Sequence, residues 1–334
     1  MKKVTMQDVA DKACVSKSTV SQYINNRYEF MSETTRTRIQ KAITELDYIP
    51  NFVAKSLKQK KSSTIGVIVA NILHTFSTEI IRAIEDACEL SHFHMFVCNA
   101  DDNPEKEREY INMLLAKQVD GLIIFPTDGN NGLYEQLKRS NFPVVFIDRK
   151  LEQAIYPTLM LDNEKAAELA VGQLLKKGRT KVGAVSMPLN LNVTPRLERI
   201  EGFRKALIAS GNNFNETWVI ATERTQIVTV LEQLWLNDDK PDAFFATNDL
   251  SLIELLKFLR KRKLRIGEDV SVIAVDDSDF LEIAATPITA IKQPTFEIGR
   301  EAAEILFELI AEPQLQDLYE IKRYAPSVVE RESV

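Results

Sequence analysis

From residue 64 onward, short apolar runs rich in β-branched and aromatic residues alternate with longer amphipathic stretches. The apolar runs predict strands in two series, TIGVIVA, FHMFVCNA, VDGLIIFP and PVVFID, followed by KVGAVSM, WVIA, DAFFATND and VSVIAVDD. The stretches between them predict helices near 77–91, 104–117, 130–140, 163–177, 196–210, 224–237 and 248–262. Strands that alternate with helices build parallel sheets covered on both faces. The pattern therefore predicts a core of two α/β lobes, each with a doubly wound parallel sheet.

The pattern before residue 50 is helical throughout. Thr5, followed three residues later by Asp8, is typical of a helix N-cap, and an apolar stripe from Val9 to Ala13 follows it at helical spacing. These residues predict a short first helix that ends near Cys14.

Two serines predict the starts of a second and a third helix. The side chains of Ser16 and Ser32 can accept hydrogen bonds from the free N–H groups of a first helical turn. The second helix is expected to end near Asn25, and the third near Leu46, with an apolar side from Ile39 onward. Three short helices in fewer than fifty residues predict an all-α helix-turn-helix domain.

The second predicted helix has two different sides. Its apolar residues gather on one side, namely Val20, Tyr23 and Ile24, and polar residues gather on the other, namely Lys17, Ser18, Ser21 and Gln22. Such a helix, almost without acids, can lie in the major groove of DNA. Gln22 can pair with an adenine edge and Lys17 with guanine acceptors. The hydroxyls of Ser18, Thr19 and Ser21 can reach bases or phosphates.

The charge of the chain is divided unevenly. Residues 1–61 hold twelve Lys or Arg and six Asp or Glu, a net charge of +6, which leaves about −12 for the rest of a chain whose net charge is −6. A basic segment joined to an acidic body suggests a polyanion-binding module. A solvated charged surface without such a role is the alternative.

Composition narrows the class of protein. The chain has 334 residues, enough for two or three domains, and 45% of them are hydrophobic. The longest apolar run, around Ile65–Leu73, is far shorter than the roughly 20 residues that span a bilayer. The first residues lack the pattern of a signal peptide, so we expect a cytoplasmic protein. Cys14, Cys88 and Cys98 lie in no Cys/His cluster, and neither a disulfide, a metal nor a cofactor is expected.

The segment NFVAKSLKQKKSS after Pro50 predicts a hinge. It is too short to persist as a helix alone in water, so we expect it to fold only on DNA. Ala54 and Leu57 lie three residues apart, so two such helices from two subunits could present Leu57 to a minor groove, where an apolar wedge kinks the duplex and Lys58 contacts phosphates. Docking of Leu57 on the core is the alternative.

Two stretches near the N-terminus resemble a known protein family. VTMQDVADKACVSKSTVSQYINN, continued by ELDYIPNFVAKSLKQKKSSTIGVI, resembles the DNA-binding head and hinge of the LacI/GalR family of bacterial transcription regulators. The resemblance implies base contacts by Lys17, Ser18 and Gln22, a wedge at Leu57, and a two-lobed core like that of periplasmic binding proteins. The residues expected at DNA are Thr5, Ser16, Lys17, Ser18, Thr19, Ser21, Gln22, Asn25, Ala54, Leu57 and Lys58. One departure is Cys14, where the family turn usually has Gly, so this turn is either strained or shifted.

Polar residues concentrate where the predicted strands of the core end, and ligands of open α/β sheets bind at those ends. The strand-end residues include Asn71 with Phe76 and Ser77, Asp101 with Asp102, Asp148 with Arg149, Asn248 with Asp249, and Asp276 with Asp277. Each could also be a helix cap or a solvated charge. Together they suit a sugar, because hydroxyls pair with carboxylates and amides while Arg binds anionic groups.

The resemblance implies which residues of this cleft contact the effector. RIEGF, FFATNDLSL and VIAVDDSD match the family segments whose effector contacts are here Arg199, Asn248 and Asp276. The expected effector-binding set is Phe76, Ser77, Asp101, Arg149, Arg196, Arg199, Asn248 and Asp276. Phe76 and Ser77 match the family's aromatic pair only in part. Three arginines suit a sugar acid, and within the family the head and hinge look closest to repressors of 2-keto-3-deoxygluconate use.

The resemblance also implies a domain order and an assembly. The expected domains are 1–48 (helix-turn-helix), 49–62 (hinge), 63–161 with 291–322 (first lobe) and 162–290 with 323–334 (second lobe). The segment 288–306 and the helix near 77–91 are expected near a dimer interface. The chain ends without the leucine-repeat tail of tetrameric members, so we expect a homodimer on a palindromic operator.

Two other classes share parts of this pattern. A Rossmann-type, NAD-dependent enzyme needs a glycine-rich turn after its first strand, and NILHTFS follows there instead. No GxSxG elbow is present, and the adjacent acids Asp101 and Asp102 would point apart on a strand. A solute-binding protein would have no use for residues 1–61. The prediction is a regulator without catalytic residues, most simply a repressor of a carbohydrate or sugar-acid operon that an effector controls.

Overall fold

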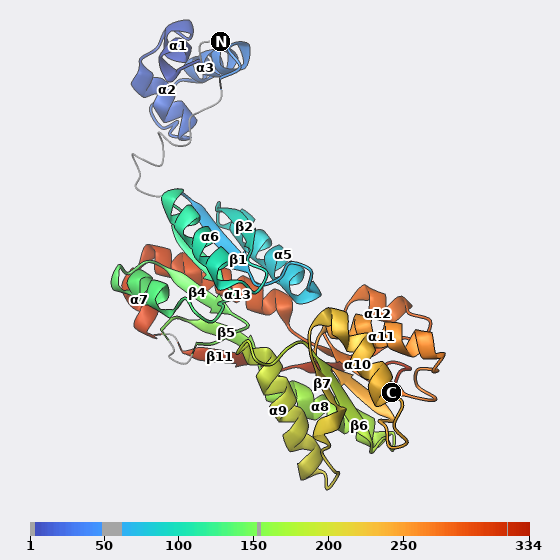
Figure 1. Ribbon diagram of the computed structural model, residues 1–334. Coiled ribbons are helices and arrows are strands. Elements are labelled where there is room, and N and C mark those ends of the chain that lie inside the picture. The colour runs from blue at the N-terminus through green and yellow to red at the C-terminus, as the bar shows by residue number, and fades with distance from the viewer. Residues whose placement is uncertain (1–3, 49–61, 152–154, 319) are drawn as a thin grey trace. The chain divides into compact units, whose positions relative to one another are not determined.

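The computed structural model describes residues 4–48, 62–151, 155–318 and 320–334. The chain forms two compact units, a head that ends at Ser62 and a core that begins at Ser63 (Figure 1). No helix in the described part of the chain is long and apolar enough to cross a membrane.

The head contains the three predicted helices. They are α1 (Met6–Lys12), α2 (Lys17–Ile24) and α3 (Glu33–Glu45). Thr5 and Asp8 form a reciprocal capping box, and the hydroxyls of Ser16 and Ser32 accept hydrogen bonds from the backbone N–H groups of Thr19 and Thr35. These caps satisfy N–H groups that have no partner inside the helix, which fixes where each helix begins.

A small apolar core joins the three helices. Its buried residues are Val9, Ala10, Ala13, Val20, Ile39, Ala42 and Tyr48. The turn between α1 and α2 passes through Cys14, whose φ is +51°. Cys14 thus adopts the left-handed conformation in which a non-glycine side chain is strained by about 1–2 kcal/mol. Of the two alternatives for this turn, the strained one is what the structure has.

The first lobe of the core has a parallel six-stranded sheet in the order β11-β5-β4-β3-β1-β2. Its strands are β1 (Thr64–Val69), β2 (His94–Asn99), β3 (Gly121–Ile124), β4 (Val144–Ile147), β5 (Thr158–Leu161) and β11 (Ile321–Tyr324). One face packs on α5 (Thr75–Leu90) and α13 (Thr295–Ala311). The other face packs on α6 (Pro104–Ala116) and α7 (Asn131–Arg139). A short 3-10 helix, η3 (Pro313–Leu318), follows α13.

The second lobe has a sheet in the order β12-β10-β9-β8-β6-β7, in which β12 alone runs antiparallel. Its strands are β6 (Val182–Ser186), β7 (Val219–Ala221), β8 (Ala243–Ala246), β9 (Ser271–Val275), β10 (Thr289–Lys292) and β12 (Ser327–Val329). One face is covered by α8 (Asn163–Lys176) and α9 (Thr194–Ala209). The other is covered by α10 (Ile227–Leu234), α11 (Asp249–Arg262) and α12 (Asp279–Ile283). The 3-10 helices η1 (Glu216–Trp218) and η2 (Arg224–Gln226) flank β7.

The fold class predicted from the strand and helix pattern is confirmed. The chain passes between the two sheets three times, after β5, after β10 and after β11. The expected lobe boundaries at 290/291 and 322/323 fall inside β10 and β11, since each strand continues in its sheet for two further residues. The three passages place both sets of strand ends around one space, where a ligand can contact both lobes.

Helices α8 and α9 pack unusually closely where Gly202 faces Glu164. A Cβ atom added at Gly202 would lie 2.8 Å from the Cα atom and 2.9 Å from the carbonyl oxygen of Glu164, both in the backbone of α8. Backbone cannot move aside as a flexible side chain can, so Gly202 fixes the distance between the two helices.

We expect Gly202→Ala to lower the free energy of unfolding by about 1–3 kcal/mol, because the added methyl group overpacks this contact. Gly172→Ala is the matched control on α8, since a Cβ atom there meets no atom within 4 Å. The control should instead stabilise the helix by about 0.5–1 kcal/mol. Urea denaturation midpoints of the two variants would measure the difference. Equal midpoints would mean that the α8–α9 contact tolerates a larger residue.

Candidate functional site

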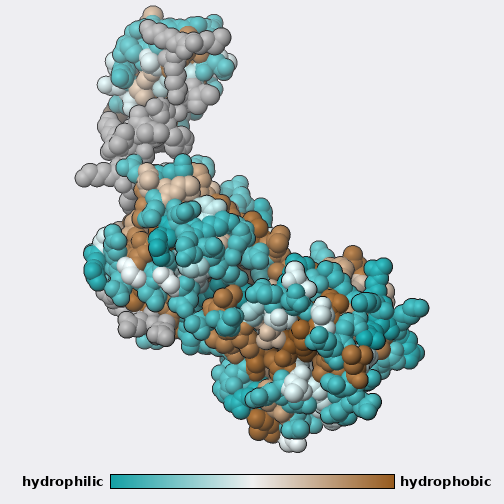
Figure 2. Space-filling view, in the orientation of Figure 1, coloured by the Kyte–Doolittle hydropathy of each residue, from teal (hydrophilic) through white to brown (hydrophobic). Residues whose placement is uncertain are grey.

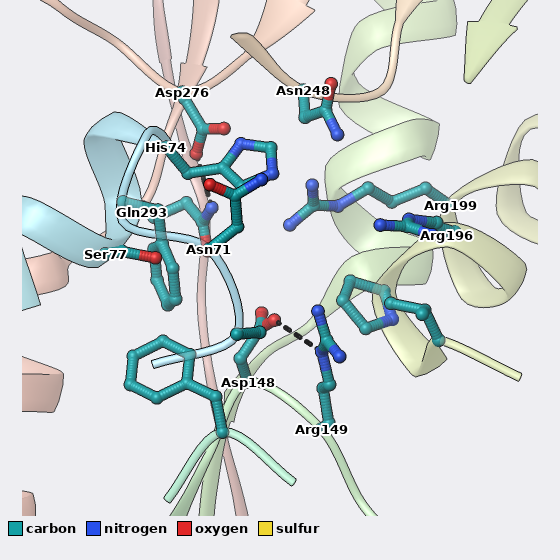
Figure 3. A pocket seen from close by; sticks show the side chains of 15 residues that line it. Asn71, His74, Ser77, Asp148, Arg149, Arg196, Arg199, Asn248, Asp276 and Gln293 are labelled. Atoms are coloured by element: carbon teal, nitrogen blue, oxygen red, sulfur yellow. Dashed lines mark hydrogen bonds and ion pairs between the residues drawn. The ribbon is translucent and has the colours of Figure 1, made fainter. Parts of the chain in front are cut away.

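The pocket between the two lobes is small and lies at the carboxyl ends of the strands of both sheets. Its volume is about 50 Å³. The residues that line it are Ala70, Asn71, His74, Phe76, Ser77, Phe125, Asp148, Arg149, Val193, Pro195, Arg196, Arg199, Asn248, Asp276 and Gln293 (Figure 3). They come from the loops after β1, β3, β4, β8, β9 and β10, from the first turn of α5 and from the first two turns of α9. The pocket is therefore assembled from segments that are distant in sequence.

Of the eight residues expected at the effector, the structure brings seven to this pocket. They are Phe76, Ser77, Arg149, Arg196, Arg199, Asn248 and Asp276. Asp101 is not among the lining residues. Its exposed carboxylate instead pairs with Lys106 at 2.5 Å and accepts a hydrogen bond from Asn99 at 2.7 Å. The neighbouring Asp102 is not among the lining residues either, but its carboxylate accepts hydrogen bonds from Arg149 and Arg196, which do line the pocket.

Arg149 and Arg196 approach each other from opposite lobes and share one carboxylate. Arg149 follows β4 in the first lobe, Arg196 lies in the first turn of α9 in the second, and each is only 7% exposed. The Nη2 atom of Arg149 donates to Oδ1 of Asp102 at 2.6 Å, and Nη2 of Arg196 donates to Oδ2 at 2.8 Å. Burial opposes ionisation of Asp102, but the two guanidinium groups outweigh it and hold the pKa of this carboxyl below its usual range. This ion-pair triad links the lobes.

Arg199 is held one helical turn further along α9 by neutral groups. Its Nε donates to the side-chain oxygen of Asn163 at 2.9 Å, and its Nη1 donates to the backbone oxygen of Thr247 at 2.6 Å. Arg199 is 5% exposed and lines the pocket. A buried guanidinium with neutral partners and an open side toward a cavity is suited to a carboxylate ligand.

Asp276, Gln293 and Asn248 form the other side of the pocket, where hydrogen-bonding groups face the cavity (Figure 3). The Nε2 atom of Gln293 donates to Oδ1 of Asp276 at 2.6 Å, and the buried Oε1 atom of Gln293 has no partner in the described residues. Asn248 caps α11 by accepting a hydrogen bond from the N–H of Ser251 at 2.8 Å. Burial, with help from the charge of Asp249, raises the pKa of Asp276 to about 6. Such donors and acceptors match the hydroxyl groups of a sugar.

His74 is a pocket residue that the sequence interpretation did not assign to the site. Its Nδ1 atom lies 2.5 Å from Oδ1 of Asp249, and the backbone N–H of Thr75 donates to Oδ2 of Asp249 at 2.8 Å. His74 and Thr75 begin α5 in the first lobe, whereas Asp249 begins α11 in the second. This is a second polar link between the lobes, and its partners are 175 residues apart in sequence.

In the head, the residues expected at DNA divide into exposed and capping groups. Lys17, Ser18 and Gln22 are exposed on α2, and Ser21 is half-buried. The others are bound locally: Thr5 and Ser16 are N-caps, the Thr19 hydroxyl is bonded to that of Ser16, and the Asn25 amide donates to the Ser21 carbonyl. Ala54, Leu57 and Lys58 lie outside the described residues.

The exposed polar side of α2 is free of acidic residues. In the parts of the chain that the structure describes, no group of three or more His, Cys, Asp or Glu side chains is arranged to hold a metal ion. What the geometry offers is thus a helix that can meet nucleic acid and, separately, a polar pocket for a small molecule.

Comparisons with known proteins agree with this division. Residues 5–51 match the family described as bacterial regulatory proteins, lacI family, and residues 171–334 match a periplasmic binding protein-like domain. A probable HTH-type transcriptional regulator, EndR of Paenibacillus polymyxa, is 42% identical over 99% of this chain and 98% of its own. The HTH-type transcriptional repressor PurR of Aliivibrio salmonicida is 33% identical over the same shares.

Solved structures with the same fold include two of the lac repressor. The repressor bound to ONPG in its repressed state has a TM-score of 0.86 at 26% identity, with full coverage of both chains. The lac repressor dimer bound to operator and the anti-inducer ONPF has a TM-score of 0.83 at 27% identity, with 99% of each chain covered. A complex of the transcriptional regulator CelR with cellobiose has a TM-score of 0.73 at 26% identity and covers 99% of this chain and 100% of that one.

We expect Asp276→Asn to stabilise the protein above pH 6. The folded pKa of Asp276, about 6, exceeds the roughly 3.9 of an unfolded Asp, so the stability that its protonated form contributes is lost as pH rises through about 6. The neutral amide escapes this loss and can still accept from Gln293. Urea denaturation should show a gain of about 1–3 kcal/mol at pH 7.5 that shrinks at pH 5. A gain of equal size at both pH values would contradict the assignment.

Proposed function

We propose, from the premise that this chain belongs to the LacI family of bacterial regulatory proteins, that it represses transcription and that a small anionic effector in the interlobe pocket sets its affinity for DNA. Its relatives over the whole chain are transcriptional regulators, so the chain is a regulator and not an enzyme. A free-standing solute-binding protein would leave the helix-turn-helix head without a use. A regulator uses both units, and it acts where the chromosome lies, in the cytoplasm.

The head reads the operator through the exposed side of α2. Lys17, Ser18 and Gln22 extend from this side toward solvent, while Val20 on the opposite side anchors the helix in the small core of the head. In a major groove, Lys17 would donate to guanine and Gln22 would pair with adenine. Thr5, Ser16, Thr19, Ser21 and Asn25 would support or contact the backbone. Leu57, with Ala54 and Lys58, would enter the minor groove at the centre of the operator.

A homodimer would carry two of these DNA-binding heads. Figure 2 shows hydrophobic residues gathered in patches on a core surface that is otherwise largely hydrophilic. Leu90 on α5 is 84% exposed, and it lies with Phe296 of α13 along a shallow groove. Apolar side chains of this kind on two neighbouring helices favour burial against an identical partner. A twofold homodimer implies a palindromic operator with one half-site for each head.

The effector is a sugar acid, and the observation that carries this proposal is the arrangement of the three buried arginines. Arg149 and Arg196 share the carboxylate of Asp102, Asp148 lies 3.7 Å from Arg149, and the hydrogen-bond partners of Arg199 are neutral. The carboxylate and amide groups on the other side of the pocket suit hydroxyls. A ligand with one carboxylate and several hydroxyl groups satisfies both sides. On the resemblance of head and hinge, 2-keto-3-deoxygluconate is the specific candidate.

Repression would follow from a difference between two states of the core. An effector that binds one arrangement of the lobes more tightly shifts the population toward it. If the affinity for operator differed about 100-fold between the arrangements, the coupling free energy would be about 2.7 kcal/mol. Footprinting on the DNA upstream of the protein's own gene, with sugar acids and with neutral sugars, tests the whole proposal. Absence of any protected DNA at low salt would contradict it.

We expect Lys17→Ala and Gln22→Ala each to lower affinity for the operator by about tenfold to a hundredfold, since one good base contact contributes about 1–3 kcal/mol. Affinity for unrelated DNA should fall much less, because phosphate contacts supply most of it. Competition binding with operator and random fragments measures both. Lys41→Ala on α3 is the control of equal charge, and its effect should be similar on both fragments. A uniform loss for Gln22→Ala would remove this residue from base recognition.

We expect Arg199→Ala to leave operator affinity within about twofold and to abolish the response to effector, because the variant loses the guanidinium at the anion side of the pocket. Release of a labelled operator fragment on titration with sugar acids measures the response. Arg204→Ala is the matched control, since Arg204 lies on the same helix but pairs with Glu201 outside the pocket. A full response in Arg199→Ala would mean that the effector binds elsewhere.

A further inference from the structure

The carboxylate of Asp102 joins the guanidinium groups of Arg149 and Arg196. It accepts one hydrogen bond from each lobe, from Arg149 at 2.6 Å and from Arg196 at 2.8 Å. Its own backbone is fixed, because the N–H of Asp102 donates to the carbonyl of Ala70 at 2.8 Å. The side chain therefore reaches both guanidinium groups from a rigid loop of the first lobe.

The pocket that this contact helps to close is too small for a six-carbon ligand. Its volume of about 50 Å³ is well below the roughly 150 Å³ of a cavity that admits benzene. Polar links between the lobes close it off, among them Asp102 with Arg196 and Asp249 with His74 and Thr75. A sugar acid can enter only if the lobes separate, and separation breaks the bond between Asp102 and Arg196.

We propose that Asp102 is a built-in substitute for the carboxylate of the effector. In the closed arrangement of the lobes it joins Arg149 to Arg196, and an anionic effector takes its place on Arg196. This inference rests on the proposed function in one respect, that the effector is a carboxylate that binds in this pocket.

The exchange explains how the pocket discriminates between acids and neutral sugars. When the lobes separate, Arg196 loses the carboxylate of Asp102, whereas Arg149 keeps it because both belong to the first lobe. A buried guanidinium without a charged partner is strongly unfavourable. A sugar acid supplies a new carboxylate to Arg196, whereas a neutral sugar offers Arg196 only hydroxyl partners. Asp102 thus stabilises the closed arrangement of the lobes by an amount of free energy that binding of a neutral ligand does not offset.

The first test measures closure of the full-length protein without ligand. The backbone N–H of Thr75 donates to Asp249 across the cleft, so its hydrogen exchange reports separation of the lobes. In Asp102→Asn, we expect this amide to exchange about tenfold faster, since a hydrogen bond to a charged group is lost. Asn tolerates the positive φ of 56° at this position, so the loop keeps its conformation.

Asp101→Asn is the matched control for this measurement. Asp101 has a φ of 54° and lies in the same loop, but its partners are Lys106 and Asn99 outside the pocket. Its substitution should leave exchange at Thr75 at the wild-type rate. If Asp102→Asn exchanges no faster than Asp101→Asn, Asp102 does not hold the lobes closed, and the proposal is overturned.

The second test uses calorimetric binding of 2-keto-3-deoxygluconate and D-galacturonate, with D-galactose as the neutral probe. Removal of the internal competitor should tighten binding of an acid to Asp102→Asn by about tenfold over wild type and leave D-galactose weak. Equal or weaker acid binding by Asp102→Asn would overturn the replacement step. If neither protein binds an acid while exchange at Thr75 rises, Asp102 does close the cleft, and the sugar-acid effector of the proposed function is wrong.

Discussion

The structure of the cleft follows from the need to satisfy buried guanidinium groups. Removing a charge from water is strongly unfavourable unless hydrogen bonds or an opposite charge replace the lost solvent. Arg149 and Arg196 meet this need through Asp102, and Arg199 meets it through Asn163 and the backbone of Thr247. These partners come from different lobes and different strand ends. The relative positions of β4, β8, α8 and α9 are therefore constrained by the hydrogen bonds of three arginine side chains.

The lobes are connected by three passages of the chain, and this connection allows them to move relative to one another. Each lobe has its own apolar core on both faces of its sheet, so it can move as a unit without loss of packing. The contacts that oppose such movement are polar and lie at the edge of the pocket. A ligand of a few atoms can therefore change the lobe arrangement, since it competes with hydrogen bonds and not with a hydrophobic interface.

The sequence predicted the architecture well because periodicity is a local property. The capped helices of the head and eight strands of the core follow from it, but β5, β10, β11 and β12 were missed, since they lie where the chain crosses between lobes and outside the regular alternation. The site was predicted less completely. The pairing of His74 with Asp249 spans 175 residues, and no local pattern distinguishes Asp102 from Asp101, because only the tertiary arrangement decides which of two adjacent side chains turns inward.

The dependence of Asp102 on two arginines from separate segments also constrains how the protein can evolve. Loss of Asp102 leaves Arg196 without a charged partner, and loss of Arg196 removes the bond that joins the two lobes, so a single substitution at either position is disfavoured even where the new residue would suit another metabolite. Change of ligand class then requires coordinated replacements at the loops after β2 and β4 and at the start of α9. Paralogues that share this scaffold should accordingly inherit these positions as a set, and recognition of new metabolites should diverge in discrete steps.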